Sequence, residues 1–303
     1  MKVFMTGGTG FVGAYLSRDL VQAGHTITIL SRRAHPQAPA GIEFLTGDPN
    51  QAGAWMAAVP EHDWIINLAG ASIFARWSEP HKKEIFASRV RTTRNLVTAL
   101  AAGDGRQLFC STSAVGYYGS RGEEELTEDS PPDDSFLGEL SRLWEAEALK
   151  AQDLGVRVVL TRFGIVLGRD GGALGQMVPL FKKFVGGPIG SGNQWFSWIH
   201  QADHARAFRF IQENPHLSGP VNLTAPHPVP NRELANALGR ALHRPSFLPA
   251  PEFMLRLVLG EFADTLLTGQ QVLPKRLLDA GFEFRFPAID AALADLLGPG
   301  SKA

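Results

Sequence analysis

Over the first half of the chain, short apolar runs alternate with longer segments in which apolar residues recur every three or four positions. The short runs, rich in β-branched residues, predict strands, and the longer segments predict amphipathic helices. The predicted strands are Lys2–Thr6, Thr26–Ser31, Glu43–Thr46, Trp64–Leu68, Gln107–Ser111 and Arg157–Arg162. The predicted helices between them include Val12–Ala23, Pro80–Ala102 and Phe136–Asp153. This alternation predicts an α/β fold with a doubly wound parallel sheet of six strands, the Rossmann type.

The pattern changes after Gly168 to Gly/Pro-rich connections with isolated aromatic residues, a composition typical of segments that line a cleft. Helical patterns then return, at Asn231–Leu242, Pro251–Leu267 and Pro274–Ala280. We therefore expect a smaller, mostly helical C-terminal lobe that binds substrate. The predicted Rossmann domain covers residues 1–168 and returns at about 197–226, and the predicted lobe covers 169–196 and 227–303.

A glycine-rich turn joins the first predicted strand to the first predicted helix. In such a turn Gly7 allows a tight bend, Gly10 lets the backbone approach a pyrophosphate, and Gly13 lets the helix pack closely on the strand. Amides at the start of the helix then bind the phosphates. The predicted dinucleotide-binding residues of this turn are Thr6, Gly7, Thr9, Gly10, Phe11, Val12 and Gly13.

The end of the second predicted strand indicates which dinucleotide is bound. An NAD site usually has Asp or Glu about 20 residues beyond the glycine turn, where it binds the ribose hydroxyls. This chain has Ser31, Arg32 and Arg33 there. Guanidinium groups bind a 2′-phosphate that a carboxylate would repel. We predict NADP(H) rather than NAD(H), with Arg32 as the stronger contact and Arg33 more readily left in solvent.

Other strand ends complete the predicted cofactor site. Asp48 follows the third strand and could accept from the adenine amino group, and Leu68, Ala69 and Gly70 let the cofactor pass over the fourth. Two arginines are ambiguous. Arg89 either reaches a cofactor phosphate or substrate anion, or lies on a solvated helix face. Arg162 either binds an anion or forms an ion pair at the end of its strand.

Composition narrows the function classes. The chain has 303 residues, 44% of them hydrophobic, and a net charge of -1, so it lacks the charge excess of proteins that bind nucleic acid or anionic membranes. No apolar run is long enough to span a bilayer. The single cysteine, Cys110, cannot form an internal disulfide and is expected to be buried. We expect a cytoplasmic monomer or homodimer with a small-molecule substrate and no metal.

These motifs resemble the extended short-chain dehydrogenase/reductase family, which includes nucleotide-sugar epimerases and dehydratases. TGGTGFVG, the turn at Asp48, NLAG, the segment Ser111–Ser113 and the segment Trp198–Asp203 follow the order of that family. SAVGYYG, GSGNQWFSWIH and GQQVLPKRLLDAGFEFRFP resemble a bacterial branch named epimerase family protein, which has its own C-terminal domain of unknown function. The resemblance covers essentially the whole chain and implies a nicotinamide cofactor.

The same resemblance shows where the chain departs from the family. The family uses a serine or threonine, a tyrosine that transfers a proton, and a lysine four residues later that lowers the pKa of the tyrosine. None of the three tyrosines here has a lysine at that spacing. Alignment of the helix through Glu145 places Leu137 and Ser141 at the tyrosine and lysine positions. In an earlier segment, Arg89 stands where the family usually has asparagine. Ser113 is the serine counterpart.

Two groups of residues remain as candidates for the chemistry. Ser113 with Tyr117 and Tyr118 could transfer the proton, helped by Arg121, or the tyrosines could simply pack at a strand end. The candidates for substrate contacts in the glycine-rich segment 186–200 are Gln194, Trp195, Trp198 and His200, with packing of the aromatic rings and a structural histidine as the alternative. Asp203 lies in the segment that the family brings under the substrate cleft, and its alternative role is to cap a helix.

Two functions follow from these candidates. The first is an NADP(H)-dependent oxidoreductase or epimerase acting on a small polar or nucleotide-linked substrate, with a degenerate Tyr/Lys pair. The second is a catalytically inactive NADP(H)-binding sensor or scaffold.

Overall fold

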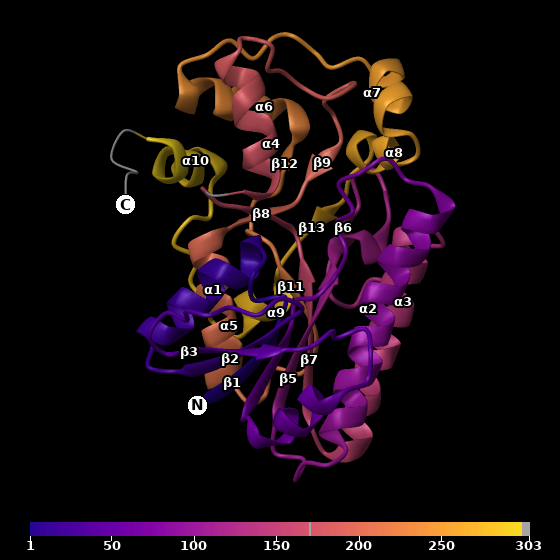
Figure 1. Ribbon diagram of the computed structural model, residues 1–303. Coiled ribbons are helices and arrows are strands. Elements are labelled where there is room, and N and C mark those ends of the chain that lie inside the picture. Colours follow the sequence, from indigo (N-terminus) through magenta and orange to yellow (C-terminus); the bar gives the residue numbers. More distant parts are fainter. Residues whose placement is uncertain (170, 299–303) are drawn as a thin grey trace.

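A parallel sheet of seven strands forms the centre of the protein (Figure 1). The computed structural model describes residues 1–169 and 171–298. The strands of this sheet are β1 (Lys2–Thr6), β2 (Thr26–Ser31), β3 (Ile42–Thr46), β4 (Trp64–Asn67), β5 (Leu108–Ala114), β7 (Arg157–Phe163) and β11 (Gly219–Leu223). Their order is β11-β7-β5-β4-β1-β2-β3. The direction of winding reverses between β1 and β4, and sheets of this topology bind ligands beside that point.

The predicted Rossmann fold class is confirmed, with one more strand than the six expected. β1 and β2 have the predicted bounds, and the other four strands differ by a few residues at their ends. The unpredicted strand is β11, which forms one edge of the sheet and pairs in parallel with β7. It begins with Gly219 and Pro220, two residues that are depleted in strands, so its local sequence gives a weak strand signal.

Helices cover both faces of the sheet. In Figure 1, α1 (Phe11–Gln22) and α5 (Gln201–Glu213) lie on one side, and α2 (Glu79–Leu100) and α3 (Phe136–Leu149) lie on the other. The alternation of side chains along each strand supplies both interfaces. On β1, Val3 and Met5 belong to the core formed with α1 and α5, whereas Phe4 belongs to the core formed with α2 and α3. Short 3₁₀ helices are η1 (Ala54–Glu61), η2 (Val115–Tyr118) and η3 (Lys150–Leu154).

The mostly helical lobe lies above the sheet in Figure 1. Its helices are α4 (Gly172–Lys182), α6 (Asn231–Leu242), α7 (Glu252–Leu259), α8 (Phe262–Leu267) and α10 (Ile289–Leu297). Short strand pairs join it to the sheet, namely β8 (Ile165–Leu167) with β10 (Trp198–His200) and β9 (Trp195–Phe196) with β12 (Val229–Pro230). The single helix predicted at Pro251–Leu267 is two helices, because Gly260 between them has a φ of 59°.

Between α8 and α10 the chain returns to the Rossmann domain. β13 (Gln271–Val272) pairs with β6 (Glu125–Leu126), and α9 (Lys275–Asp279) packs against β11. The carboxylate of Asp203 on α5 accepts from the backbone N–H groups of Arg285 and Phe286, at 2.8 and 2.7 Å. The predicted lobe, which includes 227–303, did not separate this returning segment from the lobe. Residues 170 and 299–303 of the predicted lobe lie outside the described residues.

Candidate functional site

The glycine turn between β1 and α1 is packed as tightly as its sequence predicts. Gly7 has a φ of 69°, and a side-chain carbon there would lie 2.7 Å from the backbone of Leu68. A side-chain carbon on Gly13 would lie 2.4 Å from the Gly7 carbonyl oxygen. α1 begins at Phe11 with no side-chain cap and no acidic residue in its first turn. Its first amides are therefore available to an anion.

The remaining residues of the turn divide into open and buried positions. Thr9 and Gly10 are exposed, and the half-buried Phe11 and Val12 pack against the core under α1. Thr6 is fully buried, and its hydroxyl donates to Asn67 Oδ1 at 2.7 Å. The same hydroxyl accepts from the backbone N–H of Ala69. The hydrogen bonds of Thr6 thus hold the end of β4 against the end of β1.

At the ends of β2 and β3, the polar groups differ in how far they are already engaged. Ser31 Oγ hydrogen-bonds the ring of His35 at 3.0 Å and accepts from the backbone N–H of Arg33. The side chain of Arg32 is exposed, and no acidic residue in the described part of the chain forms an ion pair with it. Asp48 accepts from the backbone N–H of Asn50 at 2.9 Å and so stabilises its own turn.

Arg89 lies against the segment that follows β4. A side-chain carbon on Gly70 would lie 3.1 Å from the central guanidinium carbon of Arg89. Arg89 Nη1 donates to the carbonyl oxygens of Ala71 and Ile85, each at 3.1 Å, and the guanidinium lies over the ring of Trp144. Burial lowers the pKa of the Arg89 guanidinium to about 10. The side chain is therefore not on a solvated helix face, which was one of its two predicted positions.

At the ends of β5 and β7 a buried ion pair occupies the site. Arg162 donates to both carboxylate oxygens of Glu145 at 2.8 Å, in a two-pronged pair that is almost wholly buried. The hydroxyl of Ser113 donates to Glu145 Oε1 at 2.6 Å. The structure thus contains the ion pair at the strand end, which was the second alternative for Arg162. Because the pair engages the guanidinium, Arg162 is not open to the cofactor, contrary to the predicted cofactor contact. Ser113 is part of the same network.

The two neighbouring tyrosines have different surroundings. Tyr118 is fully buried, donates to Asn222 Oδ1 at 2.6 Å and accepts from Arg162 Nη1 at 2.8 Å. Burial raises the pKa of Tyr118 to about 12. Tyr117 is half-buried, its ring stacks on the Arg162 guanidinium at 3.6 Å, and its hydroxyl has no hydrogen-bond partner among the described residues. Only Tyr117 therefore has a hydroxyl free to reach a ligand, and the predicted catalytic role of Tyr118 is disfavoured.

Apolar side chains surround Leu137, the residue predicted to stand at the tyrosine position of the family. Leu137 lies against the turn after β5, since a side-chain carbon on Gly116 would be 3.3 Å from Leu137 Cβ. It belongs to an apolar cluster shared by α2, α3, the segment after β4 and α8 of the lobe, whose members include Ile73, Trp77, Ile85, Phe136, Leu137, Leu140 and Phe262. Ser141, at the lysine position, is buried on the same helix. Neither residue supplies a proton-transfer group.

The four residues of segment 186–200 that are predicted to contact substrate differ in their surroundings. Trp198 is fully buried, and its indole N–H donates to the carbonyl oxygen of His227, which favours the packing alternative for this ring. His200 is also buried, and its Nδ1 accepts from Ala202 N–H and caps α5, which favours the structural alternative for this histidine. Burial lowers the pKa of His200, which favours the neutral ring that this cap needs.

Gln194 and Trp195 are half-buried. The Gln194 amide donates to the carbonyl oxygens of Ile189 and Leu266. Within residues 1–169 and 171–298, Gln194 Oε1 and the indole nitrogen of Trp195 are buried without a hydrogen-bond partner. A buried polar atom without a partner is uncommon, so these two residues stay predictions for substrate contacts.

Sequence reasoning missed the roles of three residues that shape this region. Glu145 lies four residues after Ser141 on the same face of α3, a spacing that points it at the same strand ends. Asn222, the acceptor for Tyr118, comes from the unpredicted strand β11. Asp203 binds backbone amides of the returning C-terminal segment, a long-range contact that no local pattern reveals.

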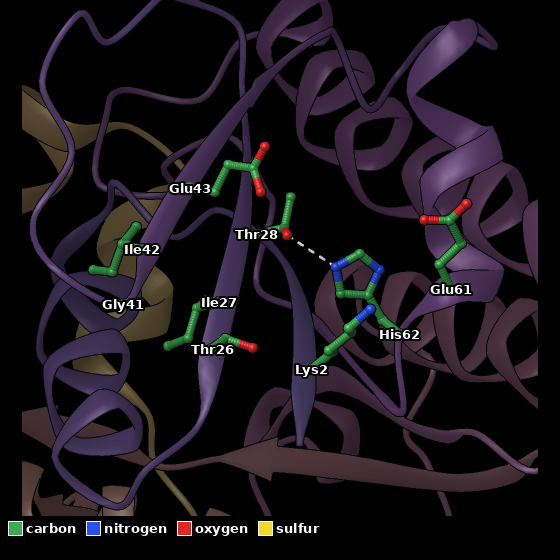
Figure 2. Close-up of a pocket in the computed structure, with 9 residues that line it drawn as sticks. All are labelled: Lys2, Thr26, Ile27, Thr28, Gly41, Ile42, Glu43, Glu61 and His62. Carbon is green, nitrogen blue, oxygen red and sulfur yellow. Dashed lines mark hydrogen bonds between the residues drawn. The ribbon is translucent and has the colours of Figure 1, made fainter.

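A pocket of about 350 Å³ lies at the amino ends of the strands, opposite the ends that carry the glycine turn (Figure 2). Its lining includes Lys2 and Thr26, the first residues of β1 and β2, and Glu43 of β3. Figure 2 shows His62 directed at Thr28, with a hydrogen bond of 2.9 Å between His62 Nε2 and the threonine hydroxyl. Because this pocket is at the amino ends of the strands, it is separate from the glycine turn and from Ser113.

Two classes of site are absent from the described residues. No group of three or more His, Cys, Asp or Glu side chains within residues 1–169 and 171–298 could hold a metal ion. Over the same ranges, no helix is both long enough and apolar enough to cross a membrane.

Comparison with protein families agrees with the geometry of the glycine turn. Residues 3–223 match the model of the NAD dependent epimerase/dehydratase family. The chain belongs to this family. Residues 250–296 match a second model, a domain of unknown function named DUF1731, which covers α7 to α9 and most of α10.

Full-length relatives extend the comparison. An epimerase family protein, YfhF, of Bacillus subtilis is 40% identical over 299 residues, which is 98% of each chain. An Arabidopsis thaliana relative, the chloroplastic homolog of epimerase family protein SDR39U1, is 42% identical and covers 98% of this chain and 87% of its own. A crystal structure of human epimerase family protein SDR39U1 (isoform 2) with NADPH is 37% identical, with a TM-score of 0.88 and coverage of 98% and 99% of the two chains.

Proposed function

We propose that this member of the family is an NADP(H)-dependent oxidoreductase or epimerase that acts on a small polar or nucleotide-linked substrate. The observation that carries the proposal is the open amino end of α1 beside the close approaches at Gly7 and Gly13. The NADPH in the human structure, at 37% identity over nearly the whole chain, supports the choice of cofactor. The proposal includes a cytoplasmic monomer or homodimer.

The residues present fit this cofactor along the strand ends. The first amides of α1 would bind the pyrophosphate, and Arg32, exposed and without an acidic partner among the described residues, would bind the 2′-phosphate. Asp48 would face the adenine end, and the turn at Leu68–Gly70 would leave room for the cofactor to cross β4.

When bound, the nicotinamide would give or take a hydride, so a nearby side chain must exchange a proton with the substrate oxygen. Among the three hydroxyls predicted for this role, Ser113 and Tyr118 are held by Glu145, Asn222 and Arg162. Tyr117 is the remaining candidate. Its ring lies on the Arg162 guanidinium, a cation–π contact that fixes the position of the phenol.

A second function, a sensor or scaffold that binds NADP(H) without catalysis, is favoured by a different observation. Leu137 packs in an apolar cluster at the tyrosine position, and Ser141 replaces the lysine. A protein that kept the cofactor site while losing its chemistry would have this arrangement.

The test is a pair of measurements on the purified protein. Calorimetric titration with NADP⁺, NADPH and NAD⁺ is expected to show that the phosphorylated cofactors bind at least about tenfold more tightly. NADPH consumption against a panel of nucleotide sugars and small carbonyl compounds then separates the two functions, with Tyr117→Phe as the variant that must lose activity. Equal affinity for NAD⁺ and NADP⁺ would refute the cofactor assignment. Tight NADP(H) binding without turnover would favour the sensor.

A further inference from the structure

The five most exposed large apolar side chains in residues 1–169 and 171–298 all lie in the lobe. Their exposed fractions run from 59% to 81%, and they are Phe184, Phe247, Phe253, Leu257 and Val258. Single exposed apolar residues are ordinary on a protein surface, whereas a group of them marks an interaction site. We call the surface that these five side chains form the apolar strip.

The three segments that carry the apolar strip adjoin one another. The backbone N–H of Ala250 donates to the carbonyl oxygen of Pro188, and the N–H of Gly190 donates to the carbonyl oxygen of Ala250, each at 2.9 Å. The segment with Phe247 therefore runs beside the segment that follows Phe184, and it leads directly into α7. Figure 1 shows this segment crossing the top of the lobe, on the side away from the sheet.

α7 is apolar on two opposite sides. On the inner side Leu255 and Leu259 are half-buried, and Leu259 joins the apolar cluster shared with α2, α3 and α8. On the outer side Phe253 and Leu257 are exposed, and no residue of α7 is fully buried. Apolar residues around most of a helix are typical of a helix that is covered on more than one side. A single chain covers only the inner side of α7.

The backbone at Phe184 also points to a contact outside the chain. Phe184 follows the C-terminal end of α4 with a φ of 63°, a left-handed conformation that glycine usually takes at this position. Its ring lies 4.8 Å from the guanidinium of Arg244 and is 59% exposed. A bulky residue in a strained conformation gains little from its own chain when its ring is mostly in solvent.

The area of the apolar strip matches one side of a protein–protein interface. Leu248 and Met254 adjoin the strip and are about half exposed. Together with them, the strip presents roughly 800 Å² of surface, which is the share that one partner contributes to an interface of standard size. The largest apolar patch on a typical monomer is smaller, at roughly 300–600 Å².

One end of the apolar strip is cationic. α4 and the segment that joins α6 to α7 contain no acidic residue. The basic residues beside the strip at this end are Lys182, Lys183 and Arg244. None of the three forms an ion pair with another residue in the described part of the chain.

The other end of the strip is acidic. α7, α8 and the turn between them contain three acidic residues and one arginine. Glu252, the first residue of α7, is exposed and has no ion-pair partner within the described ranges. When two copies meet about a two-fold axis through the strip, the cationic end of each faces the acidic end of the other. A membrane of anionic lipids would instead repel the acidic end.

We propose that the apolar strip is the interface of a symmetric homodimer, in which the strip of one copy packs against the strip of a second copy. The two-fold axis allows one apolar surface to cover itself while the unlike charges at its ends meet. The outer side of α7 is then covered by the partner. The proposal goes beyond the proposed function, because it selects the homodimer and locates its interface without any dependence on the cofactor.

The first experiment measures the mass of the protein by sedimentation velocity from about 0.1 to about 100 µM. The wild type is expected to form a species with twice the mass of one chain. Phe247→Glu and Leu257→Glu should each weaken self-association by at least about a hundredfold, because each places a charge in the apolar centre of the interface. Leu278→Glu is the matched control, since Leu278 is 45% exposed on α9, outside the strip, and this variant should keep the wild-type mass.

The second experiment tests the orientation of the two copies. A variant that combines Lys182→Glu with Lys183→Glu should weaken self-association by about tenfold, because its new acidic groups face the acidic end of the partner. Unchanged self-association of this variant would contradict the two-fold pairing of unlike ends. Circular dichroism and calorimetric titration with NADP⁺ check every variant, and each should be folded and bind NADP⁺ like the wild type.

The outcomes decide the proposal independently of the cofactor. A wild type that stays monomeric at about 100 µM would overturn it. A dimer that persists in Leu257→Glu would place the interface elsewhere and overturn it as well. A monomer that cosediments with phosphatidylglycerol vesicles would assign the strip to a membrane surface instead. A wild type that does not bind NADP⁺ would refute only the proposed function, and its measured mass would still decide the role of the strip.

Discussion

The two halves of the ligand-binding edge satisfy their polar groups in opposite ways. Over β1 and β2, the first amides of α1 and the guanidinium of Arg32 have no partner among the described side chains. Over β5 and β7, the groups bind one another: Ser113 and Arg162 both hold Glu145, and Arg162 also holds Tyr118.

The difference indicates which polar groups are available to a ligand and which are already engaged within the protein. Unpaired donors at the edge of a sheet are costly unless a ligand or water completes them, so they indicate a binding surface. A buried, mutually satisfied network is a rigid support whose members are not free to exchange protons. The half over β1 and β2 therefore has donors open to a ligand, whereas the half over β5 and β7 is closed apart from the hydroxyl of Tyr117.

The largest effect is expected from a substitution in the buried network over β5 and β7. Glu145→Ala should destabilise the protein by about 3–5 kcal/mol, because it leaves the buried Arg162 charge without its partner. The measurement is urea unfolding followed by circular dichroism. Glu139→Ala on the same helix is the control, because Glu139 pairs with Arg142 in a half-exposed ion pair. That control should lose much less stability, because an exposed ion pair contributes little, and equal losses for the two variants would contradict the buried-network account.

A side chain placed in the glycine turn should remove cofactor binding. Gly13→Ala places a carbon 2.4 Å from the Gly7 carbonyl oxygen, so the turn must shift away from the geometry that receives a pyrophosphate. We expect NADP(H) affinity to fall by at least about a hundredfold in calorimetry. Gly175→Ala, a helical glycine with open space around it, should bind NADP(H) normally. A Gly13→Ala variant with wild-type affinity would show that the pyrophosphate lies elsewhere.

Removing one charge from the open half should have an intermediate effect and change the preference between cofactors. Arg32→Ala should weaken NADP(H) by about tenfold to a hundredfold and leave NAD(H) unchanged, since only the former has a 2′-phosphate. Parallel titrations with the two cofactors measure this. Arg33→Ala should have a smaller effect on NADP(H). If Arg33→Ala has the larger effect, the two arginines exchange roles in our proposal.

The smallest effects distinguish the adjacent tyrosines. Tyr118→Phe should lower the free energy of unfolding by about 1–3 kcal/mol, because it leaves the buried Asn222 Oδ1 without a partner and removes one of the two acceptors of Arg162 Nη1. Tyr117→Phe should leave stability nearly unchanged, since its hydroxyl bonds to no described residue. Urea unfolding of both variants makes the comparison. The opposite ranking would move the open hydroxyl to Tyr118.

Local sequence determined the frame of this protein. The strand and helix bounds around the glycine turn could be predicted because apolar periodicity is a local property, and Gly7 and Gly13 mark backbone approaches that only glycine permits. The absence of a Tyr/Lys pair could be found by spacing alone. Ser31, Arg32 and Arg33 at the end of β2 indicated the cofactor for the same reason, since they follow a strand whose end is fixed by its own residues.

Only the tertiary structure decided which polar groups remain available to a ligand. Glu145 lies 17 residues before Arg162 and 32 after Ser113, and Asn222 lies 104 residues after Tyr118, so no local pattern could pair them. Trp198 and His200 were expected to face the substrate because glycine-rich segments often line clefts, yet long-range packing buries both. Whether a side chain is a ligand contact or a structural member depends on the partners that other elements bring to it, and those partners are fixed by the fold.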